Sequence, residues 1–152
     1  MVDVAVEETI ASTPLTLYGL VSDITRMCEW SPETTSCRWL DGATGPSVGA
    51  RFQGANRYGW RRWSTTCTVV EAEPGRRFVF DVNAGRLPIS RWTYDFEAAG
   101  EGCRVTETWI DRRPGWMARL GTVVMGIRDR AEHNRTGMQT TLAALRTATE
   151  PV

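Results

Sequence analysis

The feature of this 152-residue chain that most limits its fold is the stretch from Glu33 to Asp111, where short apolar and aromatic runs are separated by turn signals. Six strands fit between these turns. Strands joined by short turns pair as antiparallel neighbours, so the pattern predicts a meander and not a parallel α/β sheet. The turn signals are Asp41-Gly42, Gly45-Pro46, Glu73-Pro74-Gly75, Asn83-Ala84-Gly85 and Gly100-Glu101-Gly102.

The residues before this stretch predict one more strand and one or two short helices. Apolar and polar residues alternate from Val2 to Ile10, which is the period of a strand with one buried face. Either Ser12 or Thr13 can cap a following helix that has Pro14 in its first turn. The helical pattern stops before the segment Trp30-Ser31-Pro32.

The last third of the chain predicts one long amphipathic helix from about Pro114 to Thr149. At about 1.5 Å per residue it would extend on the order of 45 Å, enough to cross a seven-stranded sheet. The predicted class is therefore α+β, with a curved antiparallel sheet around a C-terminal helix. The stripe expected to face the sheet consists of Leu120, Val124, Ile127, Ala131, Asn134, Met138, Leu142 and Leu145.

Composition narrows the classes of function. The chain has 18 basic and 18 acidic residues, and every basic one is arginine, which fits a GC-rich bacterial genome. The balanced charge argues against nucleic-acid binding, which needs a net basic face. Acidic residues in the first apolar stretch argue against a signal peptide, and no apolar run reaches membrane-spanning length. The length fits one domain spanning 1–152.

The cysteines indicate a reducing compartment. They are far apart, without a C-x-x-C pair, which fits free thiols in the cytoplasm better than a disulfide framework or a zinc site. With one histidine and no HExxH motif, the sequence predicts no metal site. The four cysteines are Cys28, Cys37, Cys67 and Cys103.

The order of elements and several local runs resemble the polyketide cyclase/dehydrase branch of the START-like, helix-grip (SRPBCC) superfamily. The runs are SDITRM at 22–27, WSP at 30–32, GARFQG at 49–54 and the strand 63–70. The resemblance covers essentially the whole chain. It implies a cavity between sheet and C-terminal helix that holds lipids, sterols, plant hormones or polyketides, with no metal or organic cofactor. In some members such a cavity catalyses ring closure and dehydration.

Strand alternation, the helical stripe and the resemblance together name candidate ligand-binding residues. Aromatic stripes line ordinary cores as well as cavities, so the sequence allows these aromatic residues to be interpreted as core or as cavity lining. The seven tryptophans exceed what packing alone usually needs in a chain of this size. The candidates are Trp30, Phe52, Tyr58, Trp63, Thr65, Cys67, Phe80, Trp92, Tyr94, Glu107, Trp109, Val124, Ile127, Arg128, Ala131, Asn134 and Met138.

Three polar residues have alternative interpretations. Glu107 shares a strand face with Val105 and Trp109, so it is either a cavity carboxylate with a raised pKa or a carboxylate paired with arginine or water at a sheet edge. Asn134 either bonds to neighbouring side chains or faces a cavity. His133 lies away from the helical stripe and is expected to be exposed, which argues against a catalytic role.

The resemblance also bears on the cyclase reaction. Aromatase/cyclase relatives carry a cavity-facing arginine four residues after a strand tryptophan, and the position matching it after Trp63 is Cys67. A thiol cannot hold a developing enolate as a guanidinium can. The arginines that could substitute are Arg51, Arg57, Arg91 and Arg128.

The leading functional interpretation is a module, monomeric or homodimeric, that binds an apolar lipid, quinone or polyketide-like molecule without changing it. The alternative is a cofactor-independent polyketide cyclase/dehydrase that performs aldol closure and loss of water, for which the sequence assigns no catalytic residue. A third interpretation is a partner-binding regulator or toxin, whose mark would be an exposed apolar patch.

Overall fold

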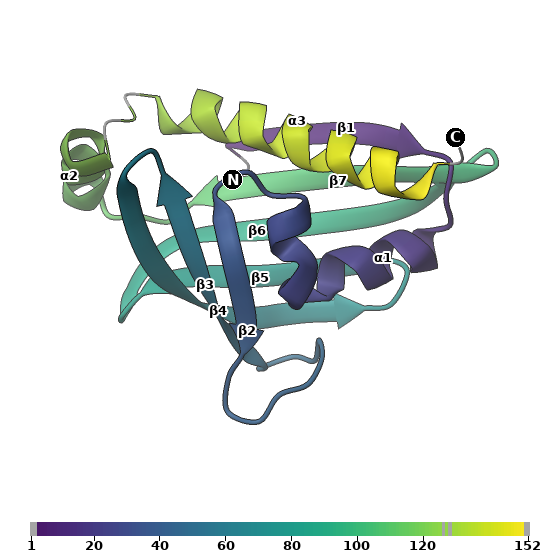
Figure 1. Ribbon diagram of the computed structural model, residues 1–152, viewed down its shortest axis with the longest axis horizontal. Coiled ribbons are helices and arrows are strands. Elements are labelled where there is room, and N and C mark those ends of the chain that lie inside the picture. Colours follow the sequence, from purple (N-terminus) through teal and green to yellow (C-terminus); the bar gives the residue numbers. More distant parts are fainter. Residues whose placement is uncertain (1–2, 126, 128, 151–152) are drawn as a thin grey trace.

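A computed structural model describes residues 3–125, 127 and 129–150, with the side chains of 122–125 left aside. The seven strands form one antiparallel sheet in the order β1-β7-β6-β5-β4-β3-β2, with the helices on its concave side (Figure 1). The elements are β1 (Val4–Ile10), α1 (Pro14–Ser22), the 3₁₀ helix η1 (Ile24–Glu29), β2 (Thr34–Trp39), β3 (Arg51–Tyr58), β4 (Arg61–Glu73), β5 (Arg77–Ala84), β6 (Leu87–Ala99), β7 (Gly102–Asp111), α2 (Gly115–Met125) and α3 (Arg130–Thr149).

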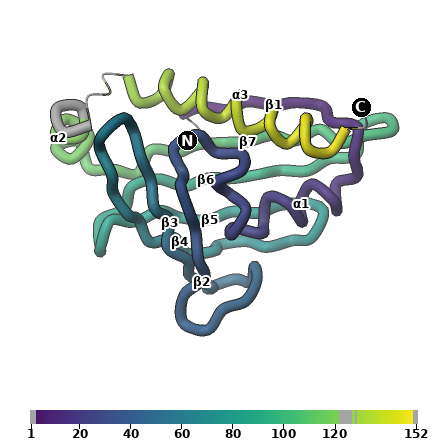
Figure 2. The backbone as a smooth tube through the Cα atoms, viewed as in Figure 1, coloured from purple at the N-terminus to yellow at the C-terminus, as the bar shows by residue number. Residues whose placement is uncertain are grey.

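The predicted meander is confirmed. Strands β2 to β7 follow one another across the sheet, and β1 closes the order by pairing with β7. Figure 2 shows the chain turning back at each hairpin. One turn was missed: β3 and β4 are joined at Gly59 and Trp60, where Gly59 has a φ of 62°. Aromatic residues on both sides of Gly59 are typical of a strand, so the sequence pattern did not indicate a turn here.

The inner face of the sheet carries the side chains that alternation assigned to it. Val6, Glu107, Tyr94 and Phe78 form one row across four strands, since each pairs with the next in register. All four are buried. A second row of Trp109, Trp92 and Phe80 lies beside it on β7, β6 and β5. Period-two alternation therefore grouped the residues of each strand correctly, although it left open whether the face that carries Glu107 is the inner one.

One end of the concave face is filled by helices. Thr13 caps α1, its side chain accepting from the Thr16 amide at 3.1 Å, and α1 packs against β5, β6 and β7. Tyr18 on α1 meets Phe78 and Phe96 edge to face, with ring centroids 6.3 and 5.9 Å apart. The second half of α3 buries its apolar side chains against the same core.

The prediction of one continuous C-terminal helix is wrong. The structure has two helices, α2 and α3, and Asp129 between them adopts an extended conformation with φ −117° and ψ 93°. Its side chain accepts a hydrogen bond from the Glu132 amide at 3.1 Å, so it caps α3 at an internal position of the predicted helix. Leu120, expected to face the sheet, is 53% exposed on α2. Within the described residues no helix is both long and apolar enough to span a lipid bilayer.

We expect Gly102→Ala to destabilise the fold. A Cβ at this position would clash with the backbone carbonyl of Ile10 where β1 ends beside β7, and a backbone group has little room to move. Overpacking of this kind costs about 1–3 kcal/mol. The free energy of unfolding from urea titration measures the change. Gly45→Ala is the control, since nothing lies within 4 Å of its added Cβ. Equal stabilities of the two variants would contradict the prediction.

Candidate functional site

A cavity of about 1130 Å³ lies between the inner face of the sheet and the first half of α3, at the end that α1 leaves unfilled. Its walls are mostly aromatic and aliphatic side chains of β3 to β7, with Met117 and Leu120 of α2 and Met138 of α3. Exposed residues such as Tyr58 and Gly59 also line it, so the cavity opens to solvent beside the β3–β4 turn.

The cavity brings together most of the candidates that the sequence named. The candidates that line it are Phe52, Tyr58, Trp63, Thr65, Cys67, Phe80, Trp92, Tyr94, Glu107, Trp109, Asn134 and Met138. Trp30 and Ile127 are buried and Ala131 is partly buried, but none of the three is among the lining residues. Arg128 and the side chain of Val124 lie outside the described residues.

A buried carboxyl group is the main polar feature of the inner wall. Glu107 is only 2% exposed, and its Oε2 accepts a hydrogen bond of 2.7 Å from the hydroxyl of Tyr94 on the neighbouring strand. Its Oε1 is buried without a hydrogen-bond partner among the described residues. Of the two interpretations of Glu107, the structure supports the cavity carboxylate: within the described part of the chain no arginine pairs with it.

The protonation of this carboxyl group follows from its burial. Removal from water disfavours the charged form and raises the pKa of Glu107 to about 8, although the hydrogen bond from Tyr94 opposes the shift. Burial, and then the carboxylate beside it, raise the pKa of the Tyr94 hydroxyl well above its usual value. At neutral pH the pair is therefore mostly uncharged, with a protonated carboxyl group that has an unpaired oxygen inside an apolar cavity.

We expect the Glu107 carboxyl group to make the protein less stable as the pH rises. Between pH 4.5, the ordinary pKa of the group, and about pH 8, the carboxyl group keeps its proton in the folded state and loses it in the unfolded state. The contribution of this group to the free energy of unfolding is therefore highest at low pH, falls across this window, and falls no further above it. The effect is a few kcal/mol, since one pKa unit corresponds to about 1.4 kcal/mol. Urea unfolding of wild type and Glu107→Gln at several pH values measures it.

In that comparison the glutamine variant should lack this component, so the difference in unfolding free energy between the two proteins changes with pH. The control is Glu101→Gln, which removes an exposed carboxylate in the β6–β7 turn. Parallel pH profiles for wild type and Glu107→Gln would contradict the assignment.

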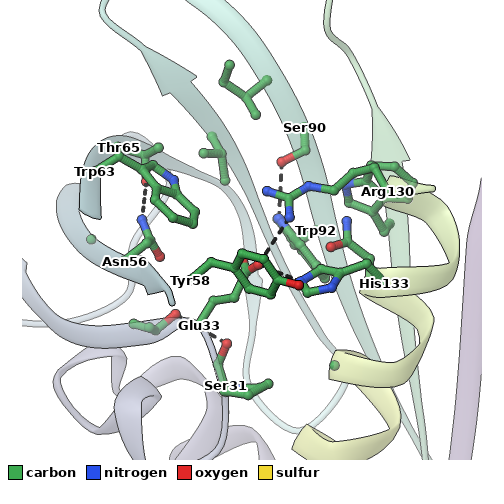
Figure 3. A pocket seen from close by; sticks show the side chains of 18 of the residues that line it. Ser31, Glu33, Asn56, Tyr58, Trp63, Thr65, Ser90, Trp92, Arg130 and His133 are labelled. Atoms are coloured by element: carbon green, nitrogen blue, oxygen red, sulfur yellow. Dashed lines mark hydrogen bonds and ion pairs between the residues drawn. The ribbon is translucent and has the colours of Figure 1, made fainter. Parts of the chain in front are cut away.

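A second polar group, the mouth cluster, consists of Glu33, Tyr58, Arg130 and His133. Glu33 Oε1 lies 2.6 Å from His133 Nε2 and accepts a hydrogen bond of 3.1 Å from Arg130. The Tyr58 ring meets the imidazole edge to face at 4.9 Å, and Figure 3 shows these side chains converging between the sheet and α3. The cluster joins the start of β2 and the end of β3 to the first turn of α3.

The expectation that His133 is exposed is wrong. Its side chain is 27% exposed, lines the cavity and bonds to a residue 100 positions earlier in the chain. Helical periodicity placed His133 away from the α3 stripe correctly, but it could not show that Glu33 and Tyr58 cover that side. Glu33 and Arg130, also missed, carry no local signal, because their roles arise only from the pairing of distant segments.

Asn134 is buried at 8% exposure and lines the cavity, so of its two interpretations the one in which it faces a cavity is supported. Other polar lining atoms belong to β3, β4 and β6. The Trp92 indole donates to the Ser90 hydroxyl at 3.1 Å, and Asn56 donates to Thr65 at 3.4 Å (Figure 3). These pairs leave the middle of the cavity to aromatic faces.

Three of the four arginines proposed as substitutes for the cyclase arginine do not enter the cavity interior, and the fourth, Arg128, lies outside the described residues. Arg51 pairs with Asp41 and Arg91 with Asp81, and neither lines the cavity. Arg57 lines only the exposed mouth, where it donates to the Gly59 carbonyl at 2.9 Å. At the position that matches the cyclase arginine, burial raises the pKa of the Cys67 thiol far above its usual value, so it remains a neutral group.

Among the described residues, the cavity shows no group suited to binding a metal ion or to thiol chemistry. Over the described ranges, no three His, Cys, Asp or Glu side chains are placed to hold a metal ion. All four cysteines are free. Burial raises the pKa of Cys37, the other lining thiol, to about 12, which makes it a poor nucleophile.

The fold and cavity define a class: a helix-grip protein with a ligand-sized, largely apolar cavity under its C-terminal helix. Residues 1–150 match the family described as "Polyketide cyclase / dehydrase and lipid transport". The chain belongs to this family, as its order of elements indicated. No curated protein sequence matches it significantly.

Solved structures agree with this assignment. A Polyketide_cyc-like protein from Corynebacterium glutamicum is 34% identical, with 95% of this chain and 90% of that one covered and a TM-score of 0.62. The di-domain ARO/CYC protein of the steffimycin biosynthetic pathway shares the fold at 13% identity, covering 95% and 49%, with a TM-score of 0.72. Major latex-like protein 151 from Panax ginseng does so at 11% identity, covering 97% of both chains, with a TM-score of 0.73.

Proposed function

We propose that the protein binds one neutral, largely apolar small molecule, such as a lipid, quinone or polyketide-like compound, in the cavity between sheet and α3. The observation that carries the proposal is the cavity itself. A volume of about 1130 Å³ lined by aromatic side chains lies directly beside a closely packed core. Such space is costly to leave to water, and an apolar ligand gains the contacts that its walls lack.

The carboxyl group inside the cavity narrows the kind of ligand. A protonated Glu107 donates one hydrogen bond, and its oxygen without a protein partner is available to a carbonyl, ether or hydroxyl oxygen of the ligand. An anionic head group would bury a charge beside this neutral acid, where no arginine among the described residues pairs to neutralise it. The cavity therefore favours uncharged molecules that carry an oxygen acceptor.

The relatives support a ligand-binding role in general, without indicating a particular ligand. The family description includes lipid transport beside cyclase and dehydrase activity. The similar ARO/CYC structure belongs to a biosynthetic pathway, whereas the ginseng structure is a major latex-like protein. The fold is thus shared by proteins with different printed roles, and the polarity of this cavity is what favours a particular class of ligand.

We expect Thr65→Trp to weaken ligand binding at least about tenfold, because an indole there would fill the centre of the cavity. Thr66→Trp is the matched control, since alternation places it on the other face of β4. Calorimetric titration with a long-chain methyl ketone and with the fatty acid of equal length compares a neutral with an anionic head group. The ketone should bind more tightly.

Native mass spectrometry of the gently purified protein provides the unbiased companion test. A neutral oxygen-containing molecule at one per chain, absent from Thr65→Trp and present in Thr66→Trp, is the expected result. No binding of the methyl ketone or the fatty acid at micromolar concentration, with no molecule found on the purified protein, or equal binding by the two variants, would contradict the proposal.

A second function, cyclisation and dehydration of a poly-β-ketone, is favoured by the Glu107–Tyr94 pair specifically. In its ionised form Glu107 can remove a proton from a carbon between two carbonyl groups. The resulting enolate attacks another carbonyl of the same chain, and the new alkoxide takes that proton from Glu107. Loss of the hydroxyl with a neighbouring C–H proton then releases water. Tyr94 would act as the positioning residue, because its hydroxyl is bound to the carboxylate.

Adding the protein to a polyketide synthase reaction tests this alternative. We expect cyclised products to increase with wild type and to fall about a hundredfold with Glu107→Gln, which cannot accept the proton but keeps the shape of the site. Tyr94→Phe should shift the pH profile of the reaction. An unchanged product profile with wild type would exclude cyclisation of that substrate and leave the binding proposal unaffected.

A further inference from the structure

Exposed large apolar side chains gather at one end of the sheet. The β3–β4 turn, the β5–β6 turn and helix α2 all follow strand ends at this end, because alternate connections of an antiparallel meander lie on the same side. Figure 1 shows them together on the left, opposite the β6–β7 turn. We name the tryptophan rim by its four residues: Trp60 (82% exposed), Leu87 (39%), Trp116 (60%) and Leu120 (53%).

The segments that carry the rim are basic. Residues 57–62, 84–89 and 112–121 contain no aspartate or glutamate. Two of their arginines are used locally, as Arg112 pairs with Asp81 and Arg113 with Asp111. The Arg61 guanidinium lies over the Trp60 ring at 4.7 Å. The others, at this same end, are Arg57, Arg62, Arg86 and Arg119.

Carboxylates near the start of α3 are already occupied. Glu33 is bound by Arg130 and His133, Asp129 caps the helix, and Glu132 lies 3.7 Å from Arg135. At the opposite end of the sheet the arginines are matched by carboxylates, as Arg76 is by Glu73 and Arg104 by Glu97. The turns and helix that carry the exposed tryptophans are therefore the basic end of the sheet, although the whole chain has no net charge.

The rim borders the opening of the cavity. Gly59, beside Trp60, and Leu120 of the rim itself both line the cavity, as does Arg57. A surface that covered the rim would therefore also cover the mouth. A ligand could then pass between that surface and the cavity without crossing water.

We propose that the tryptophan rim and its arginines dock the protein on the surface of an anionic lipid bilayer, with the cavity mouth facing the membrane. Tryptophan favours the membrane interface, where its ring is apolar and its N–H finds polar groups. Arginines beside it bind lipid phosphates, and the leucines enter the boundary of the acyl chains. Nucleic acid is the less favoured partner, because the leucines and the apolar mouth between the arginines offer no contact to a phosphate backbone.

Sedimentation with vesicles tests the proposal directly. Wild-type protein should bind phosphatidylcholine vesicles that contain about 30% phosphatidylglycerol, bind pure phosphatidylcholine at least about tenfold more weakly, and lose affinity as salt increases. Trp60→Ala and Trp116→Ala should each lower the partition coefficient about tenfold. Arg62→Gln/Arg86→Gln should remove most of the preference for anionic lipid, and neither arginine forms an ion pair with any described residue.

Matched controls come from the opposite end. Leu15→Ala removes an exposed apolar side chain that lies against the β4–β5 turn, and Arg76→Gln/Arg104→Gln removes two cations beside the turns there. These variants should bind vesicles like wild type. Glu107→Gln should also bind them unchanged, so failure of docking and failure of ligand binding remain distinguishable.

Three outcomes would overturn the proposal. The first is no sedimentation with anionic vesicles at millimolar lipid. The second is an equal loss of binding in the rim variants and in the controls, which would show nonspecific adhesion. The third is a single-stranded or duplex oligonucleotide that binds through the same arginines while vesicles do not, which would assign the basic end to nucleic acid.

Discussion

The cavity depends on an uneven filling of the concave sheet. Tyr18 of α1 and the second half of α3 pack closely against Phe78 and Phe96, so this end has the density of an ordinary core. At the other end α3 lies over the sheet without a second layer of side chains to meet it. The short α1 helix, which packs only over one end, thus determines where a ligand can bind. The mouth cluster then holds α3 above the hollow end.

The chemistry of the cavity follows from the same arrangement. Glu107 lies in a row with Val6, Tyr94 and Phe78, where water is excluded on the strand faces. A carboxyl group in this position keeps its proton at neutral pH unless a cation compensates it. The arginines that are close in sequence are instead used by Asp81, on the face of β5 opposite to Phe80, and by Asp111 at the end of β7. The inner wall therefore has a neutral acid beside uncharged polar groups, whereas the entrance is charged.

Strand faces could be predicted from the sequence, because a period of two is local and each turn restarts it. Alternation placed Trp92 and Tyr94 on the inner face, whereas it only grouped Glu107 with Val105 and Trp109 and left open whether their face is the inner one; the structure shows that all three named residues line the cavity. The break before α3 could not be predicted from periodicity, since an amphipathic pattern continues through Asp129 while a single cap interrupts the helix. The environment of His133 depends on Glu33, which pairing across the whole fold brings to it. The charge balance of the chain likewise concealed how its charges are divided in space.

The two ends of α3 are held by different forces. Toward the C-terminus Leu142 and Leu145 are buried against apolar neighbours, a non-directional contact that persists with or without a ligand. The N-terminal part is anchored where Arg130 and His133 meet Glu33, and it borders the cavity as far as Thr141. A molecule in the cavity would add apolar contact to that N-terminal part, for example at Met138. The helix α3 is therefore fixed by the core at its C-terminal end and by the mouth cluster at its N-terminal end. A ligand in the cavity makes the part of α3 between these two attachments more rigid.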